Sequence, residues 1–155
     1  MKCKIIEDVE KIVLISNNSE CIPSEPVLVS KDVFIITDKM EYGKGEPVGI
    51  ILKNRLPRPI RYWQNSTWYE IRRLEYERGI PARWVPVRTY SPCFCGAECG
   101  SAGFLTMEPE SEMQTFWDQK EGCEKNQVPA GEYRVSAKVK INGRIKTVSY
   151  EFRIR

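Results

Sequence analysis

The C-terminal stretch constrains the fold most, because its residues follow a strand pattern without interruption. In residues 133–141 the odd-numbered positions are apolar and the even-numbered positions are polar. Strict alternation of this kind is typical of a β-strand with one buried face. Asn142-Gly143 follows directly, and this pair favours a two-residue type I′ turn because both residues tolerate a positive φ. The stretch therefore predicts a β-hairpin.

The register of this hairpin is also predicted. After the turn, the apolar positions are Val148, Tyr150, Phe152 and Ile154. Pairing across Asn142-Gly143 sets Ala137 opposite Val148, Val135 opposite Tyr150 and Tyr133 opposite Phe152. Both strands then present their apolar side chains to one face, which a slip of one residue would reverse.

Elsewhere the chain favours short strands over helices. The apolar runs 33–37 and 48–52 are bounded by Gly, Pro and charged residues, which is typical of buried strands. Further strands are predicted at 11–15, 59–63, 67–75, 83–88 and 112–117. The ten prolines recur too closely for long helices. We therefore predict an all-β chain built as one antiparallel β-sandwich, with residues 89–111 as its longest aperiodic segment.

Three segments resemble known immunoglobulin-like modules. Residues 37–48 (TDKMEYGKGEPV) look like the opening of macroglobulin-type domains and of the BsuPI-like intracellular proteinase inhibitor domain. Phe116-Trp117-Asp118 and residues 128–135 (VPAGEYRV) are similar to the closing half of BsuPI-like domains. The resemblance implies an immunoglobulin-like β-sandwich over residues 31–155, preceded by an N-terminal arm over residues 1–30. It also makes proteinase inhibition one candidate activity.

The six cysteines admit several kinds of chemistry. They are Cys3, Cys21, Cys93, Cys95, Cys99 and Cys123, and three of them fall within residues 91–103 (SPCFCGAECGSAG). The interpretation we favour is disulfides: one loop cysteine pairs with Cys123, the other two close the loop, and Cys3 pairs with Cys21. Metal ligation by Cys93, Cys95, Cys99 and Cys123 is an alternative, although their spacing is a poor match to zinc knuckles. Free thiols are a third.

Catalysis is not expected. The chain contains no His, which excludes nucleophile arrangements that need an imidazole base. The sequence also lacks a Gly-rich phosphate loop, an HExxH motif and an EF-hand pattern. We therefore predict no catalytic residue and no cofactor.

Several features favour a location outside the cell. An even number of cysteines permits disulfides, which persist in oxidising compartments. Asn17 and Asn65 begin N-x-Ser/Thr sequons and are candidate glycosylation sites on a secretory route. The N-terminus does not read as a leader, so export implies a leader outside this chain. The alternative location is the cytoplasm of a thermophile, in keeping with the 29% of charged residues. No segment is apolar enough to span a membrane.

The predicted function is binding to protein. Net charge is only +3, and the basic, Trp-containing stretch 53–88 is too weak a signal for a nucleic-acid partner. We expect a non-enzymatic extracellular or surface module that binds a protein partner, or assembles with itself when a strand within residues 10–15 adds to a sheet edge. One alternative is a BsuPI-like proteinase inhibitor acting through residues 89–111. The other is a module with a Cys-ligated metal.

Overall fold

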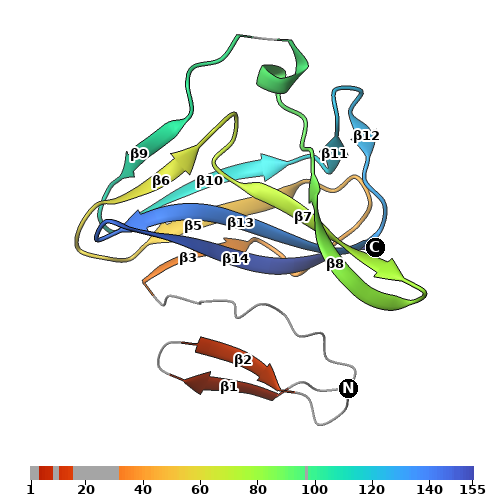
Figure 1. Cartoon of the computed structure of the whole chain (residues 1–155), viewed down its shortest axis with the longest axis horizontal. Helices are drawn as coiled ribbons and strands as arrows, with labels where there is room; N and C mark the ends of the chain where they lie inside the picture. The colour runs from red at the N-terminus through yellow and green to blue at the C-terminus, as the bar shows by residue number, and fades with distance from the viewer. Residues whose placement is uncertain (1–3, 9–10, 16–31, 97) are drawn as a thin grey trace.

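The computed structural model describes residues 4–8, 11–15, 32–96 and 98–155 (Figure 1). Within these ranges the chain is all-β, with one short 3-10 helix, η1, at Pro92–Cys95. The strands are β1 Lys4–Asp8, β2 Lys11–Ile15, β3 Val33–Thr37, β4 Glu41–Tyr42, β5 Val48–Asn54, β6 Ile60–Gln64, β7 Glu70–Glu77, β8 Ile80–Val87, β9 Gly103–Met107, β10 Ser111–Trp117, β11 Lys120–Glu121, β12 Asn126–Gln127, β13 Gly131–Ile141 and β14 Arg144–Ile154. No described helix is long and apolar enough to cross a membrane.

Two sheets form the predicted sandwich. The larger sheet has the order β4-β14-β13-β6-β9, and β7 also pairs with β13 and carries β8 at its far side. The smaller sheet has the order β10-β5-β3. Among the described strands, only the pairing of β4 with β14 is parallel. The two sheets enclose one apolar core (Figure 1).

Alternate positions on both sheets supply this core. Its fully buried members include Val33, Ile35, Ile50 and Leu52 from the smaller sheet, and Ile71, Val135, Val139 and Ile154 from the larger sheet. Aromatic rings pack at one end of the core, where the Trp117 and Tyr133 centroids lie 5.9 Å apart and those of Tyr133 and Phe152 lie 5.8 Å apart. Aromatic packing of this kind adds stability beyond the area that it buries.

The predicted C-terminal hairpin is confirmed. β13 pairs with β14 in the expected register, with Ala137 opposite Val148 and Tyr133 opposite Phe152. Asn142 and Gly143 have φ angles of 50° and 76°, as a type I′ turn requires. The apolar alternation and the turn therefore specify the same strand pairing.

The other predicted strands are present, and the structure differs from the prediction in the following respects. The strand predicted at 67–75 begins only at Glu70, because residues 65–69 leave the sheet. Strand β9 lies inside segment 89–111, which was predicted to be aperiodic, and pairs with β6. The predicted N-terminal strand 11–15 is present as β2, and it pairs with β1, a strand that was not predicted.

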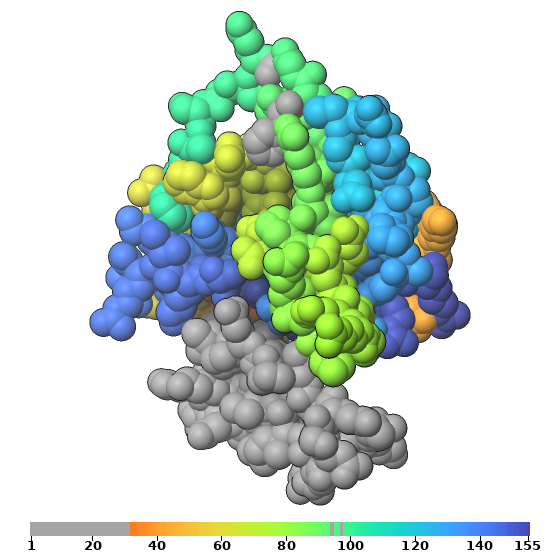
Figure 2. Space-filling model, turned by 45° about the vertical axis from the view of Figure 1, so that its right-hand side comes forward, coloured from red at the N-terminus to blue at the C-terminus, as the bar shows by residue number. Residues whose placement is uncertain are grey.

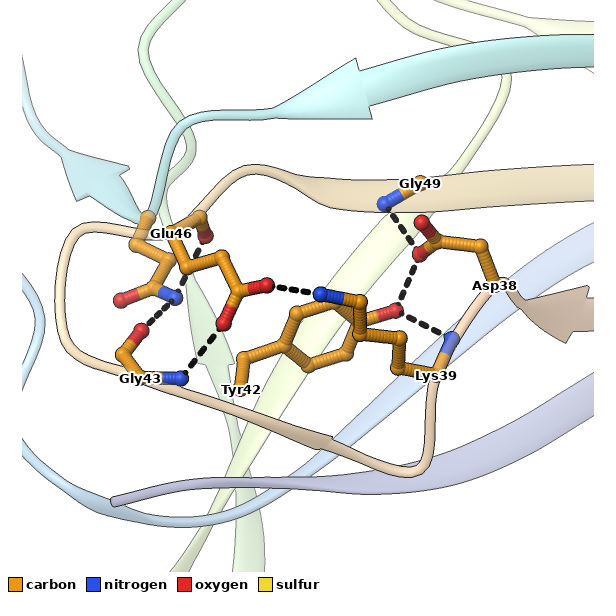
Figure 3. Close-up of polar contacts among 7 residues, drawn as sticks. Asp38, Lys39, Tyr42, Gly43, Glu46 and Gly49 are labelled. Carbon is orange, nitrogen blue, oxygen red and sulfur yellow. Dashed lines mark hydrogen bonds and ion pairs between the residues drawn. The ribbon is translucent and has the colours of Figure 1, made fainter.

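The turn between β3 and β5 contains the first of the three segments on which the family resemblance rests. The Asp38 carboxylate accepts hydrogen bonds from the Gly49 N–H, at 2.9 Å, and from the Tyr42 hydroxyl (Figure 3). A Cβ on Gly49 would lie 2.7 Å from Cγ of Asp38, so a side chain has no room there. Burial, together with the hydrogen bond to Asp38, raises the pKa of Tyr42 to about 12. These contacts hold the turn in one conformation.

A buried amide connects this turn to the segment after β10. Gln119 is fully buried, and its Nε2 donates to the carbonyls of Gly43, at 2.8 Å, and Glu46, at 2.7 Å. Its Oε1 accepts from the Gly45 N–H at 2.8 Å. Both ends of the amide are therefore used, which is how buried polar side chains are normally accommodated.

Candidate functional site: a disulfide-clamped loop and the groove at its base

The cysteine segment forms a loop that leaves the larger sheet after β8. Its first turn is the 3-10 helix η1, which has Pro at its first position, where a missing N–H does no harm. Ser91 caps the helix, because its Oγ accepts from the Cys93 N–H at 3.3 Å. Gly96 ends the helix with a φ of 103°, a conformation that favours glycine. Local sequence thus specifies a compact turn.

Two disulfides fix this loop. Cys93 is bonded to Cys99 and closes a short ring, with the two Cα atoms 5.3 Å apart. Cys95 is bonded to Cys123 in the turn between β11 and β12, with Cα atoms 5.4 Å apart. The prediction of disulfides in the loop is confirmed, and the connectivity that the sequence left open is now given. Cys3 and Cys21 lie outside the described residues.

These disulfides bear on the metal alternative. All four sulfurs of the proposed ligand set are used in the two disulfides. None of them is therefore a thiolate, which is the form that binds zinc. In the part of the chain that the structure describes, no other group of three or more Cys, Asp or Glu side chains is placed to hold a metal ion.

Main-chain and ring contacts anchor the base of the loop. Thr89 forms a β-bridge with Glu121, and the Gly122 N–H donates to the Arg88 carbonyl at 2.7 Å. The Lys125 ammonium lies 4.3 Å from the centroid of the Tyr90 ring, within range of a cation-π contact. The loop is therefore attached to the β11-β12 turn by covalent, hydrogen-bonding and electrostatic contacts.

The tip of the loop is exposed. Residues 98–102 are all solvent-accessible. Figure 1 shows the loop rising from one end of the sandwich beside β11 and β12, and Figure 2 shows the green segment after η1 standing clear of the sheet. A rigid scaffold thus presents a clamped loop to solvent.

A groove of about 520 Å³ begins at the base of this loop and follows the outer face of the larger sheet. Its lining comprises Trp63, Asn65, Ser66, Thr67, Trp68, Tyr69, Glu70, Ile71, Arg72, Val87, Arg88, Thr89, Arg134, Ser136, Ala137, Lys138, Thr147 and Ser149. Most of these residues come from strands β7, β13 and β14 and from segment 65–69, the loop between β6 and β7.

The groove exists because β13 changes partner along its length. Ser136 pairs with Glu70 of β7, whereas Val139 pairs with Tyr62 of β6. Between these points the chain from β6 to β7 loops out through residues 65–69. The groove is not predictable from the sequence, since alternation along β13 does not reveal where one neighbouring strand replaces the other.

The lining of the groove contains more cations than carboxylates. Four cationic side chains, Arg72, Arg88, Arg134 and Lys138, line it with a single carboxylate, Glu70. Arg134 is buried: its guanidinium lies 4.2 Å from the Trp84 ring centroid and donates to Glu151 at 2.6 Å.

The predicted glycosylation sites have different outcomes. Asn65 is exposed at the edge of the groove, in a turn where its N–H donates to the Thr67 carbonyl at 3.2 Å. Asn17 lies outside the described residues. Burial raises the pKa of neighbouring Tyr69 to about 12, with a smaller contribution from the charge of Asp118.

Comparison with known proteins shows no family for this chain. No protein-family model matches the chain, and no curated protein matches it either. Among solved structures, the crystal structure of Spo0M, a sporulation control protein from Bacillus subtilis, is similar with a TM-score of 0.36 and 18% sequence identity. The match covers 79% of this chain and 47% of Spo0M, so it spans about half of that protein. A likeness this weak carries no argument about fold or function.

Proposed function

We propose that the protein is a non-enzymatic binding module that contacts a partner protein through its clamped loop. The observation that carries the proposal is the pair of disulfides that fix an exposed loop on the sandwich. Association is weakened by the entropy lost when a mobile loop becomes ordered. A loop ordered before binding avoids most of this loss, so its contacts contribute more fully to affinity.

We further propose that the module works outside the cell or at its surface. Two disulfides support this location, because glutathione and thioredoxin keep most cytosolic thiols reduced. The cytoplasm of a thermophile is the alternative. Cell fractionation of the source organism separates the two locations, and recovery of the protein only from the cytosol would contradict export.

Site-specific photo-crosslinking in the source organism tests the binding proposal. A photo-reactive amino acid replaces exposed Ser101 at the loop tip, and a control replaces exposed Arg144 at the β13-β14 turn. We expect one discrete protein adduct from position 101 and none from position 144. The adduct should weaken when Cys95→Ser and Cys123→Ser release the loop. Identical adducts from both positions, or no adduct from position 101, would contradict the proposal.

Proteinase inhibition is a second candidate, because a pre-ordered loop is the kind of segment that occupies a protease cleft. The resemblance to BsuPI-like domains supports it as well. The exposed loop carries Glu98 and Ala102, so the test uses a glutamate-specific protease and one that prefers small residues. Stoichiometric inhibition at micromolar concentration is expected. Rapid cleavage of the loop, or unchanged protease activity, argues for simple binding instead.

A further proposal is that the module is a subunit of a larger assembly. β10 lies at an edge of the smaller sheet, and an edge strand can pair with another chain. Sedimentation velocity over a hundredfold concentration range is the test. A rise in mean sedimentation coefficient with concentration supports self-association, whereas a constant monomer value refutes it.

A further inference from the structure

We propose that the groove on the outer face of the larger sheet is a binding site for an anionic oligosaccharide. This site is separate from the exposed loop tip and does not depend on the proposed function. Its support comes from the depth of the groove, its charge, and the arrangement of hydroxyl and aromatic side chains.

The groove reaches the backbone layer of the sheet. Ala137 lines it even though this residue is only 4% exposed and belongs to the core cluster, so the floor of the groove lies close to the core. In the described structure no strand pairs with residues 137–138 on the side of β6 and β7. The sheet therefore has a gap at these two positions, and the groove lies over it.

The floor carries three hydroxyl groups on two adjacent strands. On β13 and β14, Ser136 lies opposite Ser149, and Lys138 lies opposite Thr147. Side chains two residues apart on a strand share a face, so all four residues face the groove together. Each hydroxyl can donate one hydrogen bond and accept others. This pattern matches a ligand that is itself rich in hydroxyl groups.

An aromatic side chain forms one wall. Trp63 lines the groove, and its ring is held by an edge contact with Phe104, with centroids 5.1 Å apart. A fixed indole offers an apolar surface to the C–H face of a sugar ring, while hydroxyls on the floor contact the ring's polar edge. Sites that combine an apolar wall with a few placed polar groups are typical for small ligands.

The charge of the groove selects an acidic sugar over a neutral one. Lys138 is exposed and lines the groove, and it forms no salt bridge with any residue that the structure describes. Arg72 also faces the groove, and its Nε donates to Glu70 at 2.8 Å. A carboxylate or sulfate on the ligand would meet Lys138 beside these hydroxyls. An acidic peptide would use the cations but would leave most of the hydroxyl floor unmatched.

Calorimetric titration of the full chain tests the proposal. The protein is produced in a host without N-glycosylation, because Asn65 lies at the groove's edge. The probes are a uronic-acid tetrasaccharide, a sulfated tetrasaccharide, neutral maltotetraose and an octaglutamate peptide, all in 150 mM salt. We expect one of the two anionic sugars to bind, and maltotetraose to bind at least tenfold more weakly. In a parallel titration, the anionic sugar that binds should quench or shift the Trp fluorescence. The identity of the sugar that binds shows whether the groove recognises a carboxylate or a sulfate group on the ligand.

Matched variants test whether binding depends on the groove itself or only on the positive charge of the protein surface. Lys138→Gln should weaken binding about tenfold, the effect of losing one charged hydrogen bond. Arg144→Gln removes the same charge outside the groove lining and should leave affinity within about twofold, and Trp63→Phe should reduce the fluorescence change. Equal losses from Lys138→Gln and Arg144→Gln, tighter binding of the peptide than of the sugars, or no sugar binding at millimolar concentration would each overturn the proposal.

Discussion

Removal of the disulfide between Cys95 and Cys123 should lower stability more than removal of the one between Cys93 and Cys99. The two bonds close loops of different length, with sequence separations of 28 and 6 residues. In the chain-entropy relation, a bridge stabilises the fold by restricting the unfolded chain, and the restriction grows with loop length. The relation gives about 3.5 kcal/mol for the longer loop and about 2 kcal/mol for the shorter one.

Equilibrium urea denaturation measures this difference. The variants are Cys95→Ser with Cys123→Ser, and Cys93→Ser with Cys99→Ser, each compared with the unaltered protein without reductant. Their free energies of unfolding should fall by about 3.5 and about 2 kcal/mol. Unaltered protein measured in reductant should be less stable than either variant. A reversed order of the two variants, or losses below about 1 kcal/mol for both, would refute the reasoning that the loop is clamped in the native protein.

Three further predictions concern the turn between β3 and β5. Gln119→Glu should lower the free energy of unfolding by about 2 kcal/mol or more, because a carboxylate would face the carbonyls of Gly43 and Glu46. Gln119→Ala is the control. If neither substitution changes stability in urea denaturation, the buried hydrogen-bond network is contradicted. Gly49→Ala should lower the thermal midpoint, since its Cβ would meet Asp38 at 2.7 Å, and an unchanged midpoint would show that the turn adapts. The pKa of Tyr42 is raised from 10.0 to about 12, so its contribution to stability is complete below pH 10 and is lost as the pH rises towards 12. In Tyr42→Phe, the free energy of unfolding should therefore fall less steeply with pH between 10 and 12. Equal slopes for the variant and the unaltered protein would contradict the pKa shift.

The sequence was most informative where independent local signals agreed. In the C-terminal hairpin, the alternation of residues 133–141, the Asn142-Gly143 turn and the apolar positions after it all required one register, and that register is present. By contrast, β9 was missed because Gly103 and the preceding glycines and cysteines mark a loop, and because Phe104, Leu105 and Met107 do not alternate with polar residues. Its pairing with β6 depends on a neighbour distant in the sequence, which local patterns do not contain.

The candidate site depends on long-range contacts to an even greater degree. The density of cysteines in residues 91–103 indicated a clamp, but only spatial proximity selects Cys123 as the partner of Cys95. The groove was not predicted, because Trp63 and Lys138 are 75 positions apart in the chain and meet only where β13 changes its neighbour. Sequence patterns therefore predicted the kind of loop, whereas the binding surfaces follow from topology.

The most direct test of the clamped loop is a disulfide map of the native protein. The protein is alkylated without reduction, digested, and analysed by mass spectrometry before and after reductant, with metal content measured on the same sample. We predict linked peptides that join Cys95 to Cys123 and Cys93 to Cys99, and a mass increase of about 2 Da for each bridge on reduction. Alkylation of all four cysteines before reduction, or retention of a stoichiometric metal ion, would contradict the clamp and favour the metal-binding alternative.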